Sequence, residues 1–170
     1  FMTDVMILAA GLGTRMKSRR AKVLHELAGM PLIAHAVRSA GELSPEALLI
    51  VVGHQASEVE QAVRQQSKHL LETNKLALPE LRFVNQAEQK GTGHAVMAAR
   101  DQLKGRGGPL VIVPGDAPLI EASTLKQLVE THRAENNDAT MLTVVMDDPT
   151  GYGRIIRNED GSLLRCVEQK

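Results

Sequence analysis

The sequence repeatedly places a short apolar run ahead of a longer amphipathic stretch, and this alternation restricts the possible folds most strongly. The apolar runs, rich in Val, Ile and Leu and short enough for strands, are Val5–Leu8, Leu48–Val52, Arg82–Asn85 and Leu110–Val113. Helical spacing of apolar residues follows each run, in Leu32–Ala40, Ala56–Gln66, Gly93–Leu103 and Thr124–Glu135. Near-continuous apolarity predicts strands that are buried on both faces. We therefore predict an α/β fold: a doubly wound, mainly parallel sheet with helices on both faces.

The pattern changes towards the end of the chain. Met141–Val145 has the composition of a further strand, and Ser123 is expected to be the N-cap of the preceding helix. Tyr152–Arg157 and Leu163–Val167 flank a turn-rich segment, which predicts a C-terminal β-hairpin. The 170 residues have the length of one domain, so we expect a single domain over residues 1–170. No helix or capping signal follows the hairpin, and we expect this domain to be truncated at its C-terminal side.

Composition argues against several classes of partner. Lys and Arg together number 20, as do Asp and Glu, so the net charge of zero does not suit a nucleic-acid binder. Phe1, Phe83 and Tyr152 are too few aromatics for a base-stacking platform. The apolar run Val5–Ala10 is too short to span a bilayer. The single cysteine, Cys166, excludes an internal disulfide and is expected in the core. We expect a cytoplasmic protein without nucleic-acid or membrane partners.

The loop after the first predicted strand, Ala9–Met16, contains two glycines that allow close backbone approach to an anion. A dinucleotide fingerprint lacks its third glycine here, because Met16 occupies that position, and no P-loop ending follows. Arg15 and Lys22 add two cations, which together with backbone donors suit a triphosphate. The alternative is a tight turn with solvated basic residues. Ligands of such sheets bind at the carboxyl ends of the strands, which favours phosphate binding.

Two further loops follow predicted strands. Gln86, with backbone N–H groups at Gly91 and Thr92, offers an amide and donors that match the edge of uracil; the alternative is a helix cap with turn glycines. Asp116, after Gly115, suits Mg²⁺, which takes one or two carboxylates and completes its shell with phosphates and water. A turn-capping role for Asp116 is the alternative.

Other candidate residues give weaker signals. Asp147 and Asp148 are interpreted as turn residues before a proline rather than as a metal site. Gly153 allows close backbone approach to a ligand, and Glu168 is either a sugar-binding acid or a surface acid. The six histidines show no paired zinc-ligand spacing, so no zinc site is predicted.

Taken together, the loops resemble the signatures of the sugar-phosphate nucleotidyltransferases. The matching motifs are Leu8-Ala9-Ala10-Gly11-Leu12-Gly13-Thr14-Arg15-Met16, Lys22-Val23-Leu24-His25, Gln86-Ala87-Glu88-Gln89, Gly91-Thr92-Gly93-His94-Ala95, Gly115-Asp116, Pro118-Leu119 and Asp148-Pro149-Thr150-Gly151-Tyr152-Gly153-Arg154. In this order, from Val5 to Lys170, they resemble the uridyltransferase (pyrophosphorylase) domain of the bacterial bifunctional N-acetylglucosamine-1-phosphate uridyltransferase/glucosamine-1-phosphate acetyltransferases. The resemblance implies a Rossmann-like nucleotide-diphospho-sugar transferase fold.

The resemblance also implies an activity and the residues that perform it. The reaction is Mg²⁺-dependent transfer of uridylyl from UTP to N-acetylglucosamine 1-phosphate, giving UDP-N-acetylglucosamine, a cell-wall and lipopolysaccharide precursor, and pyrophosphate. The implied catalytic residues are Arg15, Lys22 and Asp116, with Asp116 as the metal ligand. The implied nucleotide-binding residues are Leu8, Ala9, Ala10, Gly11, Gly13, Lys22, Gln86, Gly91, Thr92, Gly115 and Asp116. Gly153 and Glu168 would bind the sugar.

The chain departs from the family pattern in three respects. Ala21 stands where the family usually carries proline, which is expected to loosen the loop holding Lys22. Pro114 stands where some members carry tyrosine, and it lacks a backbone donor. The family's later asparagines and its acetyltransferase β-helix domain are absent from this chain, so the expected homotrimer would form only through that missing domain.

Two other functions remain open from the sequence. One is nucleotidyl transfer to another sugar phosphate, or from another nucleotide. The other is a nucleotide-binding fragment without turnover.

Overall fold

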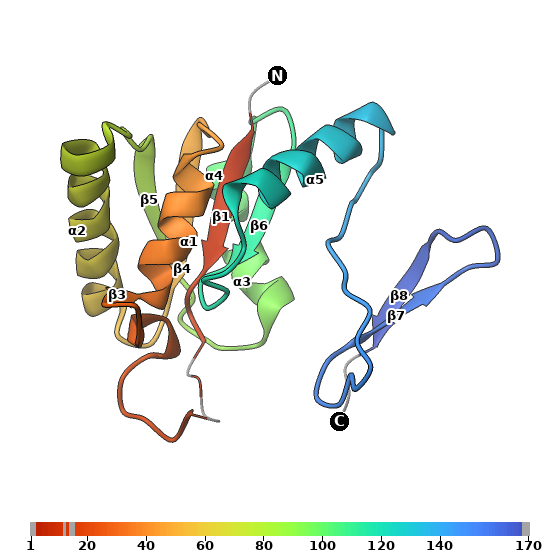
Figure 1. Ribbon diagram of the computed structural model, residues 1–170, viewed down its shortest axis with the longest axis horizontal. Coiled ribbons are helices and arrows are strands. Elements are labelled where there is room, and N and C mark those ends of the chain that lie inside the picture. Colours follow the sequence, from red (N-terminus) through yellow and green to blue (C-terminus); the bar gives the residue numbers. More distant parts are fainter. Residues whose placement is uncertain (1–2, 12, 14–15, 168–170) are drawn as a thin grey trace. The chain divides into compact units, whose positions relative to one another are not determined.

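The computed structural model describes residues 3–11, 13 and 16–167 of the chain. The chain divides into two compact units, Phe1–Thr140 and Met141–Lys170. The first contains the large sheet and the second a hairpin (Figure 1). The single domain over residues 1–170 stays a prediction.

The first unit is built on a four-stranded parallel sheet with the order β5-β4-β1-β6. Its strands are β1 (Asp4–Leu8), β4 (Ala47–Val52), β5 (Glu80–Asn85) and β6 (Leu110–Pro114). All six residues of β4 are buried, as near-continuous apolarity requires of a central strand. The parallel sheet is therefore confirmed, and the four strands predicted for it each lie within an observed one.

Helices cover both faces of this sheet (Figure 1). Val5 and Ile7 of β1 pack in one apolar cluster with α1 (Leu32–Gly41), α2 (Ala56–Asn74) and α5 (Ala122–Ala134). Met6 points to the opposite face, where a second cluster contains residues of α3 (Thr92–Ala98) and α4 (Arg100–Leu103). Alternate residues of one strand thus enter two cores, and the doubly wound architecture is confirmed.

Three helix predictions need correction in detail. Helix α2 continues past Gln66 to Asn74, because Leu70 is buried in the core. The predicted helix Gly93–Leu103 is two helices, separated at Ala99. Ser123 is not the N-cap of α5: the helix begins after the extended residue Glu121, and the Ser123 hydroxyl donates to the Glu121 carboxylate.

Small elements connect β1 to α1, and the sequence pattern did not predict them. The 3₁₀ helix η2 (Lys22–Leu24) is followed by the antiparallel pair β2 (Glu26–Leu27) and β3 (Met30–Pro31). The two residues between these strands, Ala28 and Gly29, have φ values of +52° and +79°, as a tight hairpin turn requires. Strands of two residues are too short to show an alternating pattern.

The second unit contains an antiparallel hairpin of β7 (Arg154–Arg157) and β8 (Leu163–Val167), which confirms that prediction. The predicted strand Met141–Val145 is wrong: the segment has no regular structure, and Val145 is fully exposed. A strand needs a partner for its backbone groups, and this segment pairs with none among the described residues. Cys166 is exposed on β8 rather than in a core, since two strands alone form no second layer.

No helix within the described ranges combines the length and the apolar character needed to span a membrane.

Candidate functional site

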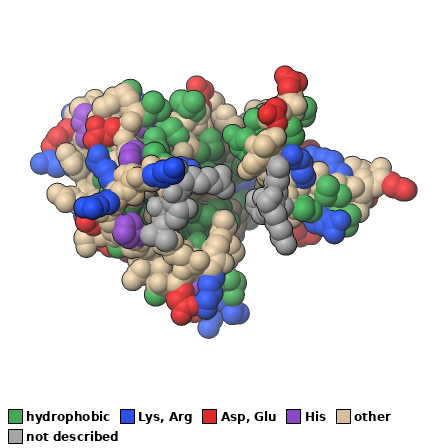
Figure 2. All heavy atoms as spheres, turned by 90° about the horizontal axis from the view of Figure 1, so that it is seen from below, with side chains coloured by type: hydrophobic (Ala, Val, Ile, Leu, Met, Phe, Trp, Pro, Cys, Tyr) green, Lys and Arg blue, Asp and Glu red, His purple; other side chains and the backbone are tan. Residues whose placement is uncertain are grey.

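The strands of the first unit end in register, so the loops that follow them leave the sheet at one edge. Leu8 of β1 lies opposite Val51 of β4 and Pro114 of β6, and Val52 pairs with Asn85 of β5. Figure 2 shows the molecule from below, so that it looks onto this edge of the sheet. In the first unit, Lys, Arg and His side chains lie on the face shown there. This is the edge where ligands of open α/β sheets bind.

Loops from β1 and β6 are joined to neighbouring strands by backbone hydrogen bonds. The Ala9 N–H donates to the Val51 carbonyl at 2.8 Å, and the Gly115 N–H donates to the Leu8 carbonyl at 2.9 Å. A Cβ on Gly115 would come within 3.0 Å of both the Leu8 oxygen and the Ile33 side chain. Gly115 is therefore required for close packing between β1 and β6, in addition to any contact with a ligand.

Gly13 and Lys22 are neighbours in the loop after β1. Gly13 has a φ of +63°, and a Cβ there would lie 2.6 Å from the Lys22 Cβ. Glycine alone suits this position, both because its backbone is left-handed and because the lysine occupies the space. Arg15, the second predicted cation, lies outside the described residues.

Lys22 and Asp116 form an ion pair at this edge. The Lys22 Nζ lies 2.5 Å from the Asp116 Oδ2, with 42% and 30% of the two side chains exposed. Opposite charges from the β1 and β6 loops therefore meet at a place that solvent and small ligands can reach. The structure thus brings together two of the three predicted catalytic residues.

Gln86 follows β5 and is buried, with 5% of its surface exposed. Its backbone N–H donates to the Val52 carbonyl at 2.7 Å. Its side-chain Nε2 donates to the Gly91 carbonyl at 3.2 Å and lies 3.0 Å from the His94 Nδ1. The amide nitrogen is thereby fixed by the start of α3, and the amide oxygen accepts no hydrogen bond from any residue that the structure describes.

Gln89 was not predicted as a site residue, but it connects two of the loops. Its Nε2 donates to the Ala10 carbonyl at 2.6 Å, across from the β5 loop to the β1 loop. A glutamine inside a Gly-rich loop motif gives no separate sequence signal, because its partner lies 79 positions away.

Open space surrounds the remaining predicted glycines of the first unit. No atom of the residues that the structure describes lies within 4 Å of a Cβ built on Gly11 or Gly91. Gly91 has a φ of +93° and precedes the first residue of α3, Thr92. Glycine is therefore suited to the turn before α3, which is the alternative that the sequence left open for this loop. The N–H groups next to Gly91 lie at the exposed start of the helix.

The described residues could hold a metal ion only if a bound ligand supplied further oxygen atoms to it. Among the residues that the structure describes, no three His, Cys, Asp or Glu side chains group closely enough to hold an ion. A lone carboxylate such as Asp116 fits Mg²⁺, which keeps several waters and takes further oxygens from phosphates. It does not fit zinc, which takes three or four protein ligands.

Gly153 belongs to the second unit, where it is exposed just before β7, and Glu168 lies outside the described residues. Asp148 accepts hydrogen bonds from the Thr150 hydroxyl at 2.6 Å and the Thr150 N–H at 3.1 Å. These two bonds, that of the hydroxyl above all, lower the pKa of Asp148. The interpretation of Asp148 as a turn residue is confirmed.

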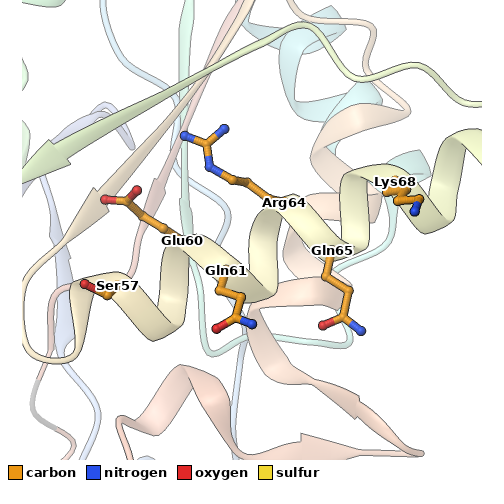
Figure 3. Close-up of a pocket in the computed structure, with 6 residues that line it drawn as sticks. All are labelled: Ser57, Glu60, Gln61, Arg64, Gln65 and Lys68. Atoms are coloured by element: carbon orange, nitrogen blue, oxygen red, sulfur yellow. The ribbon is translucent and has the colours of Figure 1, made fainter.

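A shallow depression elsewhere on the first unit contains none of the predicted site residues (Figure 3). All the residues that line it lie on α2: Ser57, Glu60, Gln61, Arg64, Gln65 and Lys68. The Arg64 guanidinium lies 4.8 Å from the centre of the Phe83 ring, a cation–π contact that fixes its position.

Comparisons with known proteins agree with this geometry. The chain is 46% identical to bifunctional protein GlmU of Bifidobacterium animalis subsp. lactis, over 99% of this chain and 35% of that protein. It is 45% identical to the GlmU of Corynebacterium efficiens, over 98% of this chain and 33% of that protein. The chain thus spans about a third of the length of the curated relatives it matches.

Solved structures share the fold. A UDP-glucose pyrophosphorylase complexed with UDP-glucose superposes with a TM-score of 0.74 at 21% identity, over 100% of this chain and 70% of that one. HddC from Yersinia pseudotuberculosis gives a TM-score of 0.68 at 22% identity, over 99% and 70%.

The model of the MobA-like NTP transferase domain matches residues 5–159, which cover nearly all of the first unit and part of the second. On this match, and on the strand-end loops that gather at one edge of its sheet, the chain belongs to the MobA-like NTP transferase family and is a nucleotidyltransferase domain.

Proposed function

We propose that this domain transfers a uridylyl group from UTP to N-acetylglucosamine 1-phosphate, with Mg²⁺, and releases pyrophosphate and UDP-N-acetylglucosamine. The observation that carries the proposal is the Lys22–Asp116 pair, at the same sheet edge as the buried Gln86. This sheet edge therefore carries a cation (Lys22), a carboxylate (Asp116) and an amide (Gln86) that could read a base. The identity to GlmU proteins supports the choice of substrates.

Gln86 would select uracil. Its amide nitrogen donates to Gly91 and lies against His94, so its oxygen can accept the N3–H of uracil. The N–H groups of Gly91, which precedes α3, and of Thr92, the first residue of α3, can donate to a carbonyl oxygen of the base. Cytosine presents an acceptor at N3 and would leave the amide oxygen without a donor, which costs about 1–3 kcal/mol in a buried site.

The phosphates would lie against the β1 loop. Backbone at Leu8, Ala9, Ala10, Gly11 and Gly13 would hold the nucleotide, and Arg15 and Lys22 would neutralise phosphate charge. An oxygen of the sugar phosphate attacks the α-phosphorus in line, the bond to the bridging oxygen breaks, and pyrophosphate leaves. No protein nucleophile is needed, because positioning and charge neutralisation account for most of phosphoryl-transfer catalysis.

Asp116 would bind Mg²⁺ together with the phosphates. The ion would supply charge neutralisation on the phosphate oxygens. In the free protein Lys22 neutralises this carboxylate, and the same lysine would turn to the phosphates when the nucleotide binds. Gly115 would lie beside the ribose, while Gly153 and Glu168 would contact the sugar.

For the full-length protein we propose two activities, in keeping with the word bifunctional in the name of its relatives. The second, acetyl transfer to glucosamine 1-phosphate, would belong to a β-helix domain that also forms a homotrimer. Both reactions would take place in the cytoplasm and supply peptidoglycan precursors for cell-wall biogenesis.

The test is pyrophosphate release by the full-length protein. We expect release only when UTP, Mg²⁺ and N-acetylglucosamine 1-phosphate are all present, and we expect Asp116→Ala to abolish it. Asp101→Ala, at an exposed position of α4, is the matched control and should retain turnover. Full turnover by Asp116→Ala would contradict the metal assignment.

A panel of nucleotides and sugar phosphates tests the alternatives. A preference for CTP would contradict the role of Gln86. A preference for dTTP would change the nucleotide but not that role, because thymine presents the same N3–H and carbonyl oxygens as uracil. A preference for another sugar phosphate would replace the second substrate. Tight UTP binding in calorimetry without turnover under any condition would instead identify a binding domain.

A further inference from the structure

One side-chain hydrogen bond fixes the segment that carries Lys22. The Ala21 N–H donates to the Gln55 Oε1 at 2.5 Å, from the β1–α1 connection to the connection between β4 and α2. Ala21 is completely buried and precedes the first residue of η2. Without Gln55 this N–H would be a buried donor with no partner, which is costly.

Gln55 adopts a backbone conformation that a glutamine rarely takes. Its φ of +55° and ψ of +43° are left-handed, a conformation that is strained for a residue other than glycine. Its carbonyl accepts the Val59 N–H at the start of α2, but its side chain makes no capping bond to that helix. The side chain is instead directed to Ala21. A glycine would avoid the strain but would lose this contact.

The bond acts next to the catalytic lysine. Lys22 follows Ala21 directly, and its Cβ already lies against Gly13 on the other side. Beyond it, Val23 and Leu24 are buried in the core, and the Leu24 N–H donates to the Ala21 carbonyl at 2.9 Å. The backbone of Lys22 is thus held before, beside and after the residue, and Gln55 provides the first of these contacts.

We propose that Gln55 is a positioning residue, which holds the Lys22 backbone so that its ammonium group reaches Asp116 and the nucleotide phosphates. The proposal rests on the proposed function for the identity of the ligand. It also explains how the chain accommodates Ala21. Proline has no N–H to donate, so this contact exists only because residue 21 is not proline. The φ of −54° at Ala21 is one that proline can adopt.

The hydrogen bond can be tested by changing either its acceptor, Gln55, or its donor, Ala21. Gln55→Gly removes the acceptor and leaves the Ala21 N–H unpaired, but it also relieves the left-handed strain, so the net change in stability should be small. Ala21→Pro removes the donor and puts a ring carbon against the Gln55 oxygen. We expect each change to lower kcat/KM for UTP about tenfold or more, since small misplacements of a catalytic group have large effects.

The double variant Ala21→Pro/Gln55→Gly gives the decisive comparison. Once Gln55 is gone, the proline ring has no oxygen to collide with. Gln55→Gly should therefore lower turnover in the natural background, but leave it unchanged or raise it in the Ala21→Pro background. In a Lys22→Ala background Gln55→Gly should change turnover less than twofold, because Gln55 acts through Lys22.

Lys75→Gly is the matched control. Lys75 is also left-handed, with a φ of +55°, and lies at the other end of α2, where its ammonium group donates to the Glu72 carbonyl at 3.4 Å. This substitution relieves the same kind of strain without touching Ala21, and turnover should be that of the natural protein.

Amide hydrogen exchange at Ala21 tests the bond without any turnover. Gln55→Gly should speed this exchange at least tenfold, and Lys75→Gly should leave it unchanged. Unaltered Ala21 exchange, or unaltered kcat/KM for UTP in Gln55→Gly, would overturn the positioning role. If the natural protein releases no pyrophosphate, the proposed function fails. In that case amide exchange at Ala21 and the affinity for UTP, measured by calorimetry, still test whether Gln55 positions Lys22.

Discussion

At the level of single residues, the site depends on glycines, which leave room for neighbouring groups, as well as on polar side chains. Gly13 leaves the space that Lys22 occupies, and Gly115 lets the β6 loop reach the Leu8 carbonyl. Gly11, two positions before Gly13, has open space around it. The same residue type therefore has two different surroundings in one loop: Gly13 makes room for a neighbouring side chain, and Gly11 borders open space.

This difference predicts opposite results for two alanine substitutions. Gly13→Ala should lower the free energy of unfolding by about 1–3 kcal/mol, from left-handed strain and the clash with Lys22. Gly11→Ala should change it by less than about 0.5 kcal/mol, because the new methyl group meets nothing. Urea unfolding of both variants measures the difference. Equal stability of the two would show that the Gly13 backbone relaxes without cost.

Gln86 allows a second prediction at this scale. Gln86→Ala should reduce the preference for UTP over CTP, measured as the ratio of kcat/KM values, by about 10- to 100-fold, the equivalent of one lost buried hydrogen bond. Gln66→Ala is the control: Gln66 is also buried, but in α2, and its loss should leave the ratio unchanged. An unchanged ratio in Gln86→Ala would assign uracil selection to the backbone alone.

At the scale of elements, turns are fixed by side chains close in sequence. In the second unit the Asp160 Oδ1 accepts the Ser162 N–H at 2.9 Å, between β7 and β8, and hydrogen bonds with Ser162 lower the pKa of Asp160. Hydrogen bonds from Thr150, its hydroxyl first, lower the pKa of Asp148 in the same way. Such local bonds explain why the hairpin could be predicted from a short turn-rich segment.

These shifts predict how the turns respond to acid. A carboxylate with a lowered folded-state pKa stabilises the fold above its unfolded pKa of about 3.9, and loses this contribution as pH falls through the lowered value. We therefore expect both turns to loosen only below about pH 4. Carboxyl NMR titration measures this. Thr150→Val should raise the pKa of Asp148 and leave that of Asp160 unchanged; a parallel rise at Asp160 would contradict the local origin.

At the scale of the whole molecule, one buried carboxylate connects the starts of three strands, at the sheet edge opposite the site. Asp4 begins β1, accepts the N–H of Ala47 at the start of β4, and pairs with Arg106, which precedes β6. The two Asp4–Arg106 distances are 2.5 and 2.8 Å. The hydrogen bond with Asp4 raises the pKa of Arg106. This carboxylate helps to set the register that aligns the strand-end loops.

Loss of this pair should destabilise the fold without altering the chemistry. Arg106→Ala should lower the free energy of unfolding by about 2–4 kcal/mol, because it leaves the Asp4 charge buried, and kcat should stay unchanged. Arg82→Ala removes a more exposed pair with Glu80 and should cost less than about 1 kcal/mol. Similar losses in the two variants would contradict the importance of burial.

The parallel sheet, the helices that follow its strands and the hairpin could be predicted from the sequence, because each depends on periodicity or on turn residues within a short window. The sequence also indicated Lys22, Gln86 and Asp116 as a set, since strand-end loops of such a sheet meet at one edge. It could not reveal the contacts between Gln55 and Ala21 or Gln89 and Ala10, or the close approach of Gly13 to Lys22. These contacts join residues from different segments or depend on the exact path of a loop, and only the packed tertiary structure decides which of them form.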